Sequence, residues 1–324
     1  MTQTADAPSA GPATVAARPT SMFVSGAFPR RRLAVVGLSA LAGFLLTVVW
    51  SASFVDQTIG DNVADTMLGH HAKDAPIGGI LSGIAFALAS GVAGTFTACN
   101  VAVFGTLAPL LGQNQSARGR MLQTLRPIGW LSAGMLAVSA TYGAIVGVVG
   151  THLPQFQTAR PATGLSPRTI QAMVVFGIIG LVMLWLGLAA VGVVKDPLAR
   201  VSARFPNAPL VLMGALIGGF LIGRPFALFR QMFRDAAESH NPLYGALAFS
   251  LQSIGNIVIL TVIFLLMALL VGGRLRNWIS AKPSRAAVMV GAALITVGVF
   301  TVLYWDVRIL ANRDLIWYPR APWA

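Results

Sequence analysis

Long apolar stretches constrain this chain more than any other feature of its sequence. They cover residues 33–54 and, further along, about 128–150, 169–194, 243–271 and 285–305. At a rise of about 1.5 Å per residue, each stretch is long enough to cross a hydrocarbon layer roughly 30 Å thick. Only 10% of the residues are charged, whereas a soluble domain has about 25%. The sequence therefore predicts an all-α, polytopic integral membrane protein.

Two further apolar segments are interrupted by polar or helix-breaking residues. Residues 77–112 are too long for one straight span and contain Thr95, Thr97 and Asn100 close together. Residues 208–233 are interrupted at Gly223-Arg224-Pro225. Backbone groups freed by a break inside a membrane must find partners without water, so such breaks are tolerated where they line a cavity or are buried in protein. With these two segments the sequence predicts about seven transmembrane helices.

The distribution of charge predicts the topology. The net charge is +13, but the basic residues occupy short loops between apolar spans. This distribution is typical of the signal that orients a membrane protein, and it argues against nucleic-acid binding. With the amino terminus inside, the inner segments hold fourteen basic residues and two acids, and the outer segments hold nine and eight. We expect a multi-pass protein of the cytoplasmic membrane, with a cytoplasmic amino terminus and an extracytoplasmic carboxyl terminus.

The ends of the chain differ in composition from the spans. Residues 1–29 are rich in Ala, Pro, Thr and Ser and are expected to be a disordered cytoplasmic tail. Residues 30–55 begin with three arginines and read as an uncleaved first helix or, alternatively, as a signal peptide cut near Ser51-Ala52-Ser53. Residues 306–324 are rich in aromatic side chains and are expected to lie on the outer membrane surface.

The order of segments repeats along the chain. A broken segment, a basic loop and two ordinary spans make up residues 77–194, and the same order recurs in residues 208–305. Because each half contains an odd number of spans, the two halves have opposite orientations in the membrane. In such inverted repeats the broken helices of both halves meet near the middle of the bilayer and form the site. This 3+3 arrangement follows one leading helix.

Polar residues at membrane depth are the candidates for that site. Cys99 is the one cysteine of the chain, and it is interpreted either as a functional thiol or as a small buried packing residue. Arg224 in the second break is costly to bury and is expected to hold an anionic group or an orphan carbonyl. The remaining candidates for a substrate path, which alternatively bond neighbouring helices together, are Thr97, Asn100, Pro225, Phe226, Gln252 and Asn256.

An inverted repeat makes a geometric prediction about these residues. We expect Cys99 and Phe226 to occupy equivalent places around one central cavity, with Asn100 facing Gln252 or Asn256 across it. Gln252 and Asn256 are four residues apart and share one face of a helix.

Other kinds of site are not indicated. The sequence contains no phosphate-binding loop, no serine-hydrolase elbow and no metalloprotease motif. All four histidines fall in the predicted outer loops, so haem held between helices is not expected, and we expect no cofactor or metal. No carboxylate is placed inside a span, which argues against a proton-coupled pump.

The segments "TFTACNVAVFGTLAPLLG", which contains Cys99, and "IGRPFALF", which contains Pro225, carry a family resemblance. Residues 77–305 resemble the CcdA/DsbD-type membrane family, which passes reducing equivalents to extracytoplasmic thiol proteins in disulfide repair and cytochrome c maturation. In that family each half of an inverted repeat carries a cysteine in a proline-flanked break. Here Ala98 stands where a proline is expected, and Phe226 stands in place of the second cysteine.

This resemblance implies thiol–disulfide exchange with Cys99 as the single thiol of the chain. A dithiol relay needs a second thiol to resolve the mixed disulfide, so a partner such as a thioredoxin-like protein would supply it. Two alternatives stay open. The same scaffold suits a transporter of small solutes, for which Arg224 would favour anions, and the chain also suits a non-catalytic subunit of a larger membrane complex.

Overall fold

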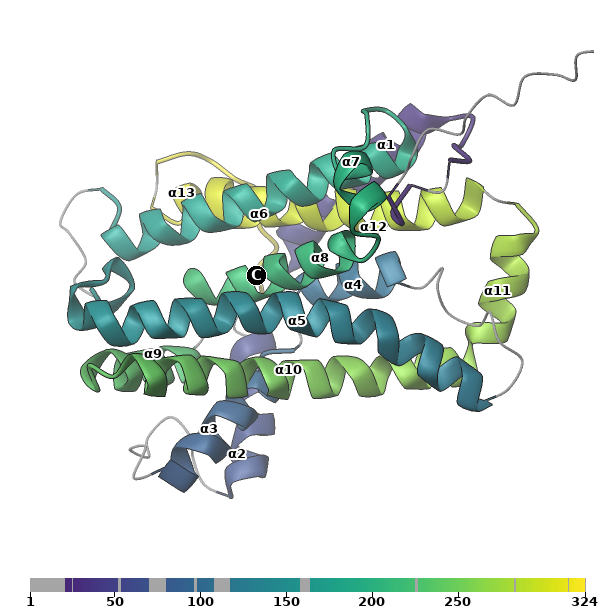
Figure 1. The fold of residues 1–324 in the computed structure, drawn as a ribbon. Coiled ribbons are helices and arrows are strands. Elements are labelled where there is room, and N and C mark those ends of the chain that lie inside the picture. The colour runs from purple at the N-terminus through teal and green to yellow at the C-terminus, as the bar shows by residue number, and fades with distance from the viewer. Residues whose placement is uncertain are drawn as a thin grey trace, which may run out of the picture.

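The computed structural model describes residues 21–24, 26–51, 54–69, 80–95, 98–107, 117–157, 164–224, 227–282, 284–313 and 315–323. These residues form an all-α, polytopic membrane protein, and no strand occurs among them (Figure 1). The long helices are α1 (Arg32–Val49), α5 (Ala117–Val149), α6 (Pro167–Val191), α10 (Pro242–Leu270) and α12 (Ser284–Val302). The last of these continues through a π-helical turn, η6 (Leu303–Val307), into α13 (Arg308–Ala311).

The two interrupted segments predicted from the sequence are both broken in the structure. The first consists of α3 (Ile80–Ala93) and α4 (Ala98–Leu107). The second consists of α8 (Ala208–Gly219) with a 3-10 turn, η5 (Phe220–Ile222), followed by α9 (Ala227–Glu238), and its two helices are bent by 81°. The remaining elements are η1 (Phe54–Asp61), α2 (Asn62–Leu68), η3 (Gly150–His152), η4 (Pro154–Phe156), α7 (Ala199–Arg204) and α11 (Gly272–Ser280).

The number of full spans is lower than the seven predicted. Within the described residues, five helices are long and apolar enough to cross a membrane, or six when the bent pair of α8 and α9 is counted as one span. The remaining predicted span, residues 77–112, contains two helices of 14 and 10 residues, which are each too short to cross the hydrocarbon layer alone.

Local sequence signals explain where two of the long helices begin. Ser166 caps α6 by accepting a hydrogen bond from the backbone N–H of Thr169, and Pro167 occupies the first helical position. Asn241 caps α10 by accepting from the N–H groups of two residues, and Pro242 follows it. A polar cap followed by proline is the common start of a helix, because proline lacks the N–H that would otherwise need a partner.

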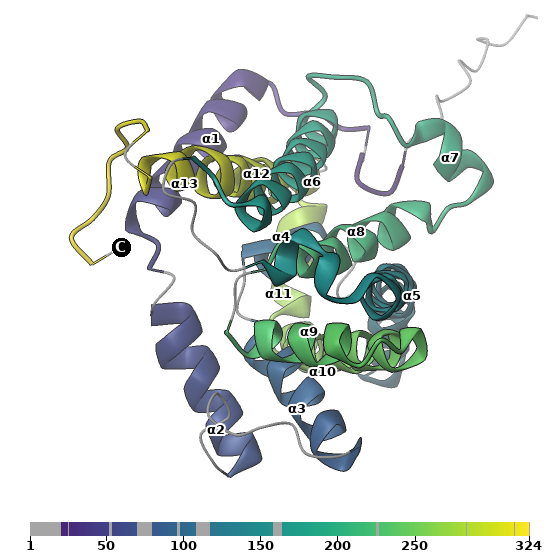
Figure 2. The same ribbon diagram turned by 90° about the vertical axis from the view of Figure 1, so that its left-hand side faces the viewer.

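The helices pair in an exchanged pattern. The most extensive contacts join α5 to α10 and α6 to α12, while α3 packs on α10 and α8 packs on α5. Figure 2 shows α5 and α10 next to one another, with α3 beyond α10 and α8 on the opposite side of α5. The first part of each broken segment therefore packs on a long helix of the other half, which is the exchange expected of two halves in opposite orientation.

Glycines allow these helices to approach closely. Gly143 of α5 and Gly245 of α10 face one another, and a Cβ added to either would overlap the carbonyl of the other. Without water to drive apolar association, membrane helices gain stability from such close backbone packing. Glycines meet a neighbouring backbone in three further helix pairs: Gly91 and Gly255 between α3 and α10, Gly134 and Gly214 between α5 and α8, and Gly180 and Gly298 between α6 and α12.

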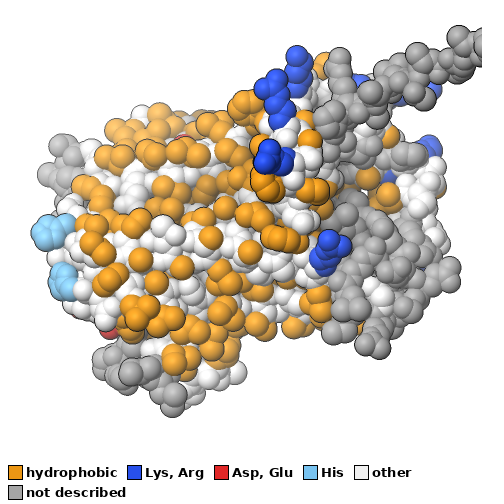
Figure 3. Space-filling view, in the orientation of Figure 1, with side chains coloured by type: hydrophobic (Ala, Val, Ile, Leu, Met, Phe, Trp, Pro, Cys, Tyr) orange, Lys and Arg blue, Asp and Glu red, His pale blue; other side chains and the backbone are white. Residues whose placement is uncertain are grey.

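The two ends of the bundle differ in charge (Figures 1 and 3). At one end lie α7, α11 and the starts of α5 and α12, and we call this the basic end because it carries Arg126, Arg200, Arg204, Arg274, Lys282 and Arg285. At the other end, the histidine end, lie the end of α5, η3, η4 and the start of α6, together with His152 and His240. The loops predicted to be cytoplasmic thus share one end.

The prediction of a disordered tail over residues 1–29 is wrong for its last part. Phe23 and Val24 are buried, at 2% and 6% exposure, and Phe23 belongs to the main apolar core. The backbone N–H of Ser21 donates to Asp196 at 2.7 Å, and the Arg32 side chain donates to the carbonyl of Gly192 at 2.7 Å. Residues 22–24 are apolar, and the burial of Phe23 and Val24 docks this part of the tail on the bundle. Residues 1–20 lie outside the described residues.

The carboxyl-terminal segment folds back along the end of α1. Its position on the outer membrane surface stays a prediction. The Arg308 side chain, 6% exposed, donates to the carbonyls of Thr47 at 2.7 Å and Trp50 at 2.9 Å. Further contacts join Tyr318 to the Thr47 hydroxyl, the Ala321 N–H to the Val48 carbonyl, and the Trp323 indole N–H to the Val49 carbonyl. The last carbonyls of α1 are thereby satisfied, as a helix end requires where water is scarce.

Helix packing through glycine gives a first prediction. Gly134→Ala should destabilise the protein by about 1–3 kcal/mol, because the new methyl group would overlap the Val211 carbonyl of α8 and force the helices apart. Unfolding in a detergent titration measures the change. Gly129→Ala on the same helix is the control, since no atom lies within 4 Å of its added Cβ, and equal losses in both variants would contradict the packing.

Candidate functional site

The first break is held together by side chains. After α3 ends at Ala93, Gly94 and Thr95 form a turn, and α4 begins at Ala98. The Thr95 hydroxyl donates to the Gly91 carbonyl at 3.1 Å, and the Asn100 amide donates to the Thr95 carbonyl at 2.6 Å. The polar residues that mark this break in the sequence therefore satisfy backbone groups that the missing helical turn leaves open.

The second break follows η5. Gly223 and Arg224 are non-helical, and α9 begins at Ala227. The carbonyl of Ile222, which the break frees, accepts a hydrogen bond of 2.6 Å from the Gln171 amide of α6. Gly223 is buried, and a Cβ added to it would overlap Ala172 and Phe176 of α6. A larger residue would therefore push α6 away from the break.

Arg224 joins the two breaks. Its Nη2 donates to the Gly94 carbonyl at 3.0 Å, from one interrupted segment to the other. The guanidinium lies directly on the glycine, because a Cβ added to Gly94 would be 2.5 Å from Nη1 and 2.7 Å from Nη2. A half-buried arginine in a membrane is costly unless backbone carbonyls or charges receive it. The sequence predicted that Arg224 holds either an anionic group or an orphan carbonyl. In the structure it binds a carbonyl, that of Gly94.

Buried amides lie beside this contact. The Asn100 Nδ2 of α4 donates to Oδ1 of Asn256 of α10 at 3.1 Å, so the predicted contact between these residues is confirmed. Gln252 lies one turn before Asn256 on the same helix and is 2% exposed. We call Asn100, Gln252 and Asn256 the amide cluster. Next to it on α10, the Ser253 hydroxyl bonds Ser139 of α5 at 2.6 Å.

The amide cluster retains unused hydrogen-bonding capacity. Oε1 of Gln252 and the hydroxyl of Ser90, which is fully buried on α3, have no hydrogen-bond partner. Unpaired polar atoms in a protein interior cost about 1–3 kcal/mol each, and they are commonly satisfied by a bound molecule. The sequence did not single out Ser90, since an isolated serine in an apolar helix gives no signal of its own.

Cys99 is the second residue of α4, at the edge of the first break. Its side chain lies outside the described residues, as do Thr97, Pro225 and Phe226. The predicted placement of Cys99 and Phe226 around one cavity therefore stays a prediction.

The electrostatics of the breaks favour negative charge. Helices α4 and α9 both begin at a break, and the first N–H groups of a helix carry a partial positive charge of about half an elementary unit. Arg224 adds a full positive charge between the two segments. Across the described part of the chain, no three His, Cys, Asp or Glu side chains come together in the manner of metal ligands.

The expectation that no carboxylate lies within a span is wrong for Asp306. The last apolar helix continues to Ala311, about six residues beyond the predicted end at 305, and Asp306 sits in its π-helical turn. Its Oδ2 is buried without a hydrogen-bond partner, and the carboxylate lies over Gly177 of α6. The aromatic residues around Trp305 had indicated that the tail begins there, so Asp306 was predicted to lie outside the span.

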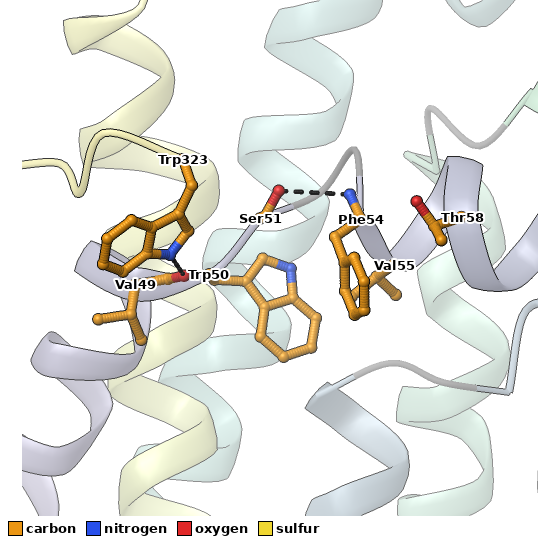
Figure 4. Close-up of a pocket in the computed structure, with 7 residues that line it drawn as sticks. All are labelled: Val49, Trp50, Ser51, Phe54, Val55, Thr58 and Trp323. Carbon is orange, nitrogen blue, oxygen red and sulfur yellow. Dashed lines mark hydrogen bonds between the residues drawn. The ribbon is translucent and has the colours of Figure 1, made fainter.

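A separate pocket of about 750 Å³ lies at the end of α1 (Figure 4). In Figure 4 the Trp323 ring from the carboxyl-terminal segment and the Trp50 ring stand on one side, with Phe54 and Val55 of η1 beside them. Its volume is typical of small-molecule sites. It belongs to other elements than the two breaks, and its lining residues are Val49, Trp50, Ser51, Phe54, Val55, Thr58 and Trp323.

Comparison of the chain with protein-family models, with curated proteins and with solved structures found no match. The functional assignment therefore depends on the geometry at the two breaks.

A double-mutant cycle tests the contact across the breaks. Asn100→Ala and Asn256→Ala should each destabilise the protein, and the double variant should lose less than the sum, because one hydrogen bond joins the two side chains. The coupling expected within a membrane is about 0.6 kcal/mol and at most about 1.7 kcal/mol. Thr261→Ala on α10 is the control partner, since its hydroxyl bonds only the Ile257 carbonyl of its own helix, and its losses should add to those of Asn100→Ala.

Proposed function

We propose that this membrane protein takes part in thiol–disulfide exchange through Cys99. The observation that carries the proposal is the position of Cys99 in the first turn of the half-helix α4, at a break that Arg224 reaches from the opposite segment. Helix N-termini and neighbouring arginines stabilise a thiolate, and the thiolate is the nucleophile of disulfide exchange. The resemblance of this segment to the CcdA/DsbD-type family supports the same reaction.

The proposed reaction needs one thiol of this chain and two of a partner. The Cys99 thiolate attacks a substrate disulfide, forms a mixed disulfide with one sulfur and releases the other as a thiolate. One thiolate of the partner dithiol then attacks the Cys99 sulfur of the mixed disulfide and releases the substrate as a dithiol, which leaves Cys99 bonded to the partner. The second partner thiolate attacks this bond, forms the partner's own disulfide and restores the Cys99 thiolate. Two electrons pass from the partner to the substrate, and Cys99 ends in its starting state.

The partner and the orientation follow from the same proposal. A thioredoxin-like protein has the dithiol that the reaction requires. The basic end would face the cytoplasm, in keeping with the positive-inside rule, and the histidine end would face the extracytoplasmic thiol proteins.

Reactivity of the single thiol tests this proposal. We expect purified protein in vesicles to release one equivalent of thiopyridone per chain from 4,4′-dithiodipyridine. Arg224→Gln should slow this reaction about tenfold at pH 7, because the break loses a positive charge that would favour the thiolate. Arg200→Gln, a change of an exposed arginine on α7 at the basic end, is the matched control and should react at the wild-type rate.

A cellular measurement decides whether the thiol is used. Acid quenching and alkylation of cells that express a tagged chain should trap a mixed-disulfide adduct that is absent from Cys99→Ser. If Cys99→Ser supports normal maturation of extracytoplasmic thiol proteins and no adduct is found, thiol exchange is not the function.

A second candidate function is transport of small anions. It is favoured by the Oε1 of Gln252 and the hydroxyl of Ser90, which are unsatisfied among the described residues, and by the half-helix N-termini and the Arg224 guanidinium at the breaks. Broken helices with N-termini directed at the substrate form the anion sites of many transporters. Positive charge at the breaks therefore suits either an anionic solute or a thiolate.

Flux measurements separate the two functions. If the protein transports anions, vesicles that contain it should take up chloride, acetate or phosphate, and Arg224→Gln should reduce the flux at least about tenfold. Cys99→Ser should then transport normally, whereas it abolishes thiol exchange. Absence of flux for all three anions in vesicles with correctly folded protein would rule out this candidate.

A further inference from the structure

A second buried polar group lies between the second break and the histidine end. The Tyr142 hydroxyl of α5 donates to Oε1 of Gln155 in η4. The Gln171 amide of α6 donates to the Tyr142 hydroxyl at 3.3 Å and to the Ile222 carbonyl at 2.6 Å. We call Tyr142, Gln155 and Gln171 the tyrosine cluster. None of its members is needed to explain the reactivity of Cys99.

The tyrosine cluster is incompletely satisfied. Nε2 of Gln155 and Oε1 of Gln171 are buried atoms with no hydrogen-bond partner, and the Gln155 side chain is only 4% exposed. One of these atoms is a donor and the other an acceptor, so a single molecule that both accepts and donates would satisfy the two. Water has this property, and buried water commonly occupies such positions.

Polar groups continue from this cluster to the breaks. The Ile222 carbonyl, which Gln171 bonds, is two residues from Arg224, and Arg224 bonds the Gly94 carbonyl. From there Thr95 and Asn100 lead to Asn256 of α10. These hydrogen bonds, linked along the backbone from Ile222 to Arg224 and from Gly94 to Thr95, form a series of polar groups from the start of α6 to the amide cluster. The other described interior residues of the bundle are mainly apolar.

We propose that the tyrosine cluster is the hydrated end of an access path by which water and small anions reach the breaks from the histidine end. The charges around it select the ligand class. Arg168 lies one turn before Gln171 at the start of α6, and Arg230 and Arg234 are exposed on α9. The Asp235 carboxylate accepts a hydrogen bond from Tyr244, and Glu238 follows it on α9. The three arginines and two carboxylates together carry one net positive charge, which favours anions over cations.

Cysteine accessibility tests this path without reference to Cys99. In the Cys99→Ser background, Gln155→Cys and Gln171→Cys each place one thiol in the tyrosine cluster. Val174→Cys, three residues further along α6 and 55% exposed on the outside of the bundle, is the lipid-facing control. The probes are two membrane-impermeant methanethiosulfonates, the anionic sulfonatoethyl and the cationic trimethylammonioethyl reagent, added to sealed vesicles of each orientation.

We expect both cluster thiols to react from the histidine end only, at least about tenfold faster than Val174→Cys, and faster with the anionic than with the cationic reagent. Two variants are used so that failure of one to fold does not end the test. Cluster thiols that react no faster than Val174→Cys, that react from the basic end, or that prefer the cationic reagent would overturn the proposal. Because every variant lacks Cys99, this result is independent of thiol exchange, which the rate of the wild-type thiol measures.

Discussion

The fold depends on a single requirement, that backbone groups freed inside the membrane find partners within the protein. Each break meets it with hydrogen bonds donated by side chains. Gln171 of α6 donates a hydrogen bond to the Ile222 carbonyl. Asn100 donates to the Thr95 carbonyl, and Arg224 donates to the Gly94 carbonyl. The bond between Arg224 and the Gly94 carbonyl joins the two interrupted segments. The positive charge of Arg224 is therefore held between them.

The positive charge at the two breaks explains why two different functions fit the same site. The N-termini of α4 and α9 and the guanidinium of Arg224 produce a positive region in a medium of low polarity. A thiolate and a small anion are stabilised by the same field. The scaffold alone therefore does not decide between the two proposed functions.

The surrounding helices hold this region in place through close backbone contacts. Glycines at the α5–α10 and α3–α10 crossings remove the side chains that would separate the helices. At the two ends, segments outside the spans add to the bundle: Phe23 enters the main core, and Arg308 secures the end of α1.

The sequence by itself determined the class of protein, the long spans, the sorting of charge to one end and the positions of both breaks, because these follow from length, hydrophobicity and helix-breaking residues. Tertiary structure decided which groups meet. Helices such as α8 and α10 are apolar on nearly every face, so periodicity does not reveal which side contacts a neighbour. Asn100 and Asn256, 156 residues apart, were paired through the assumed repeat, whereas the Gly94 carbonyl under Arg224, the burial of Phe23 and the depth of Asp306 depend on how the chain packs in three dimensions.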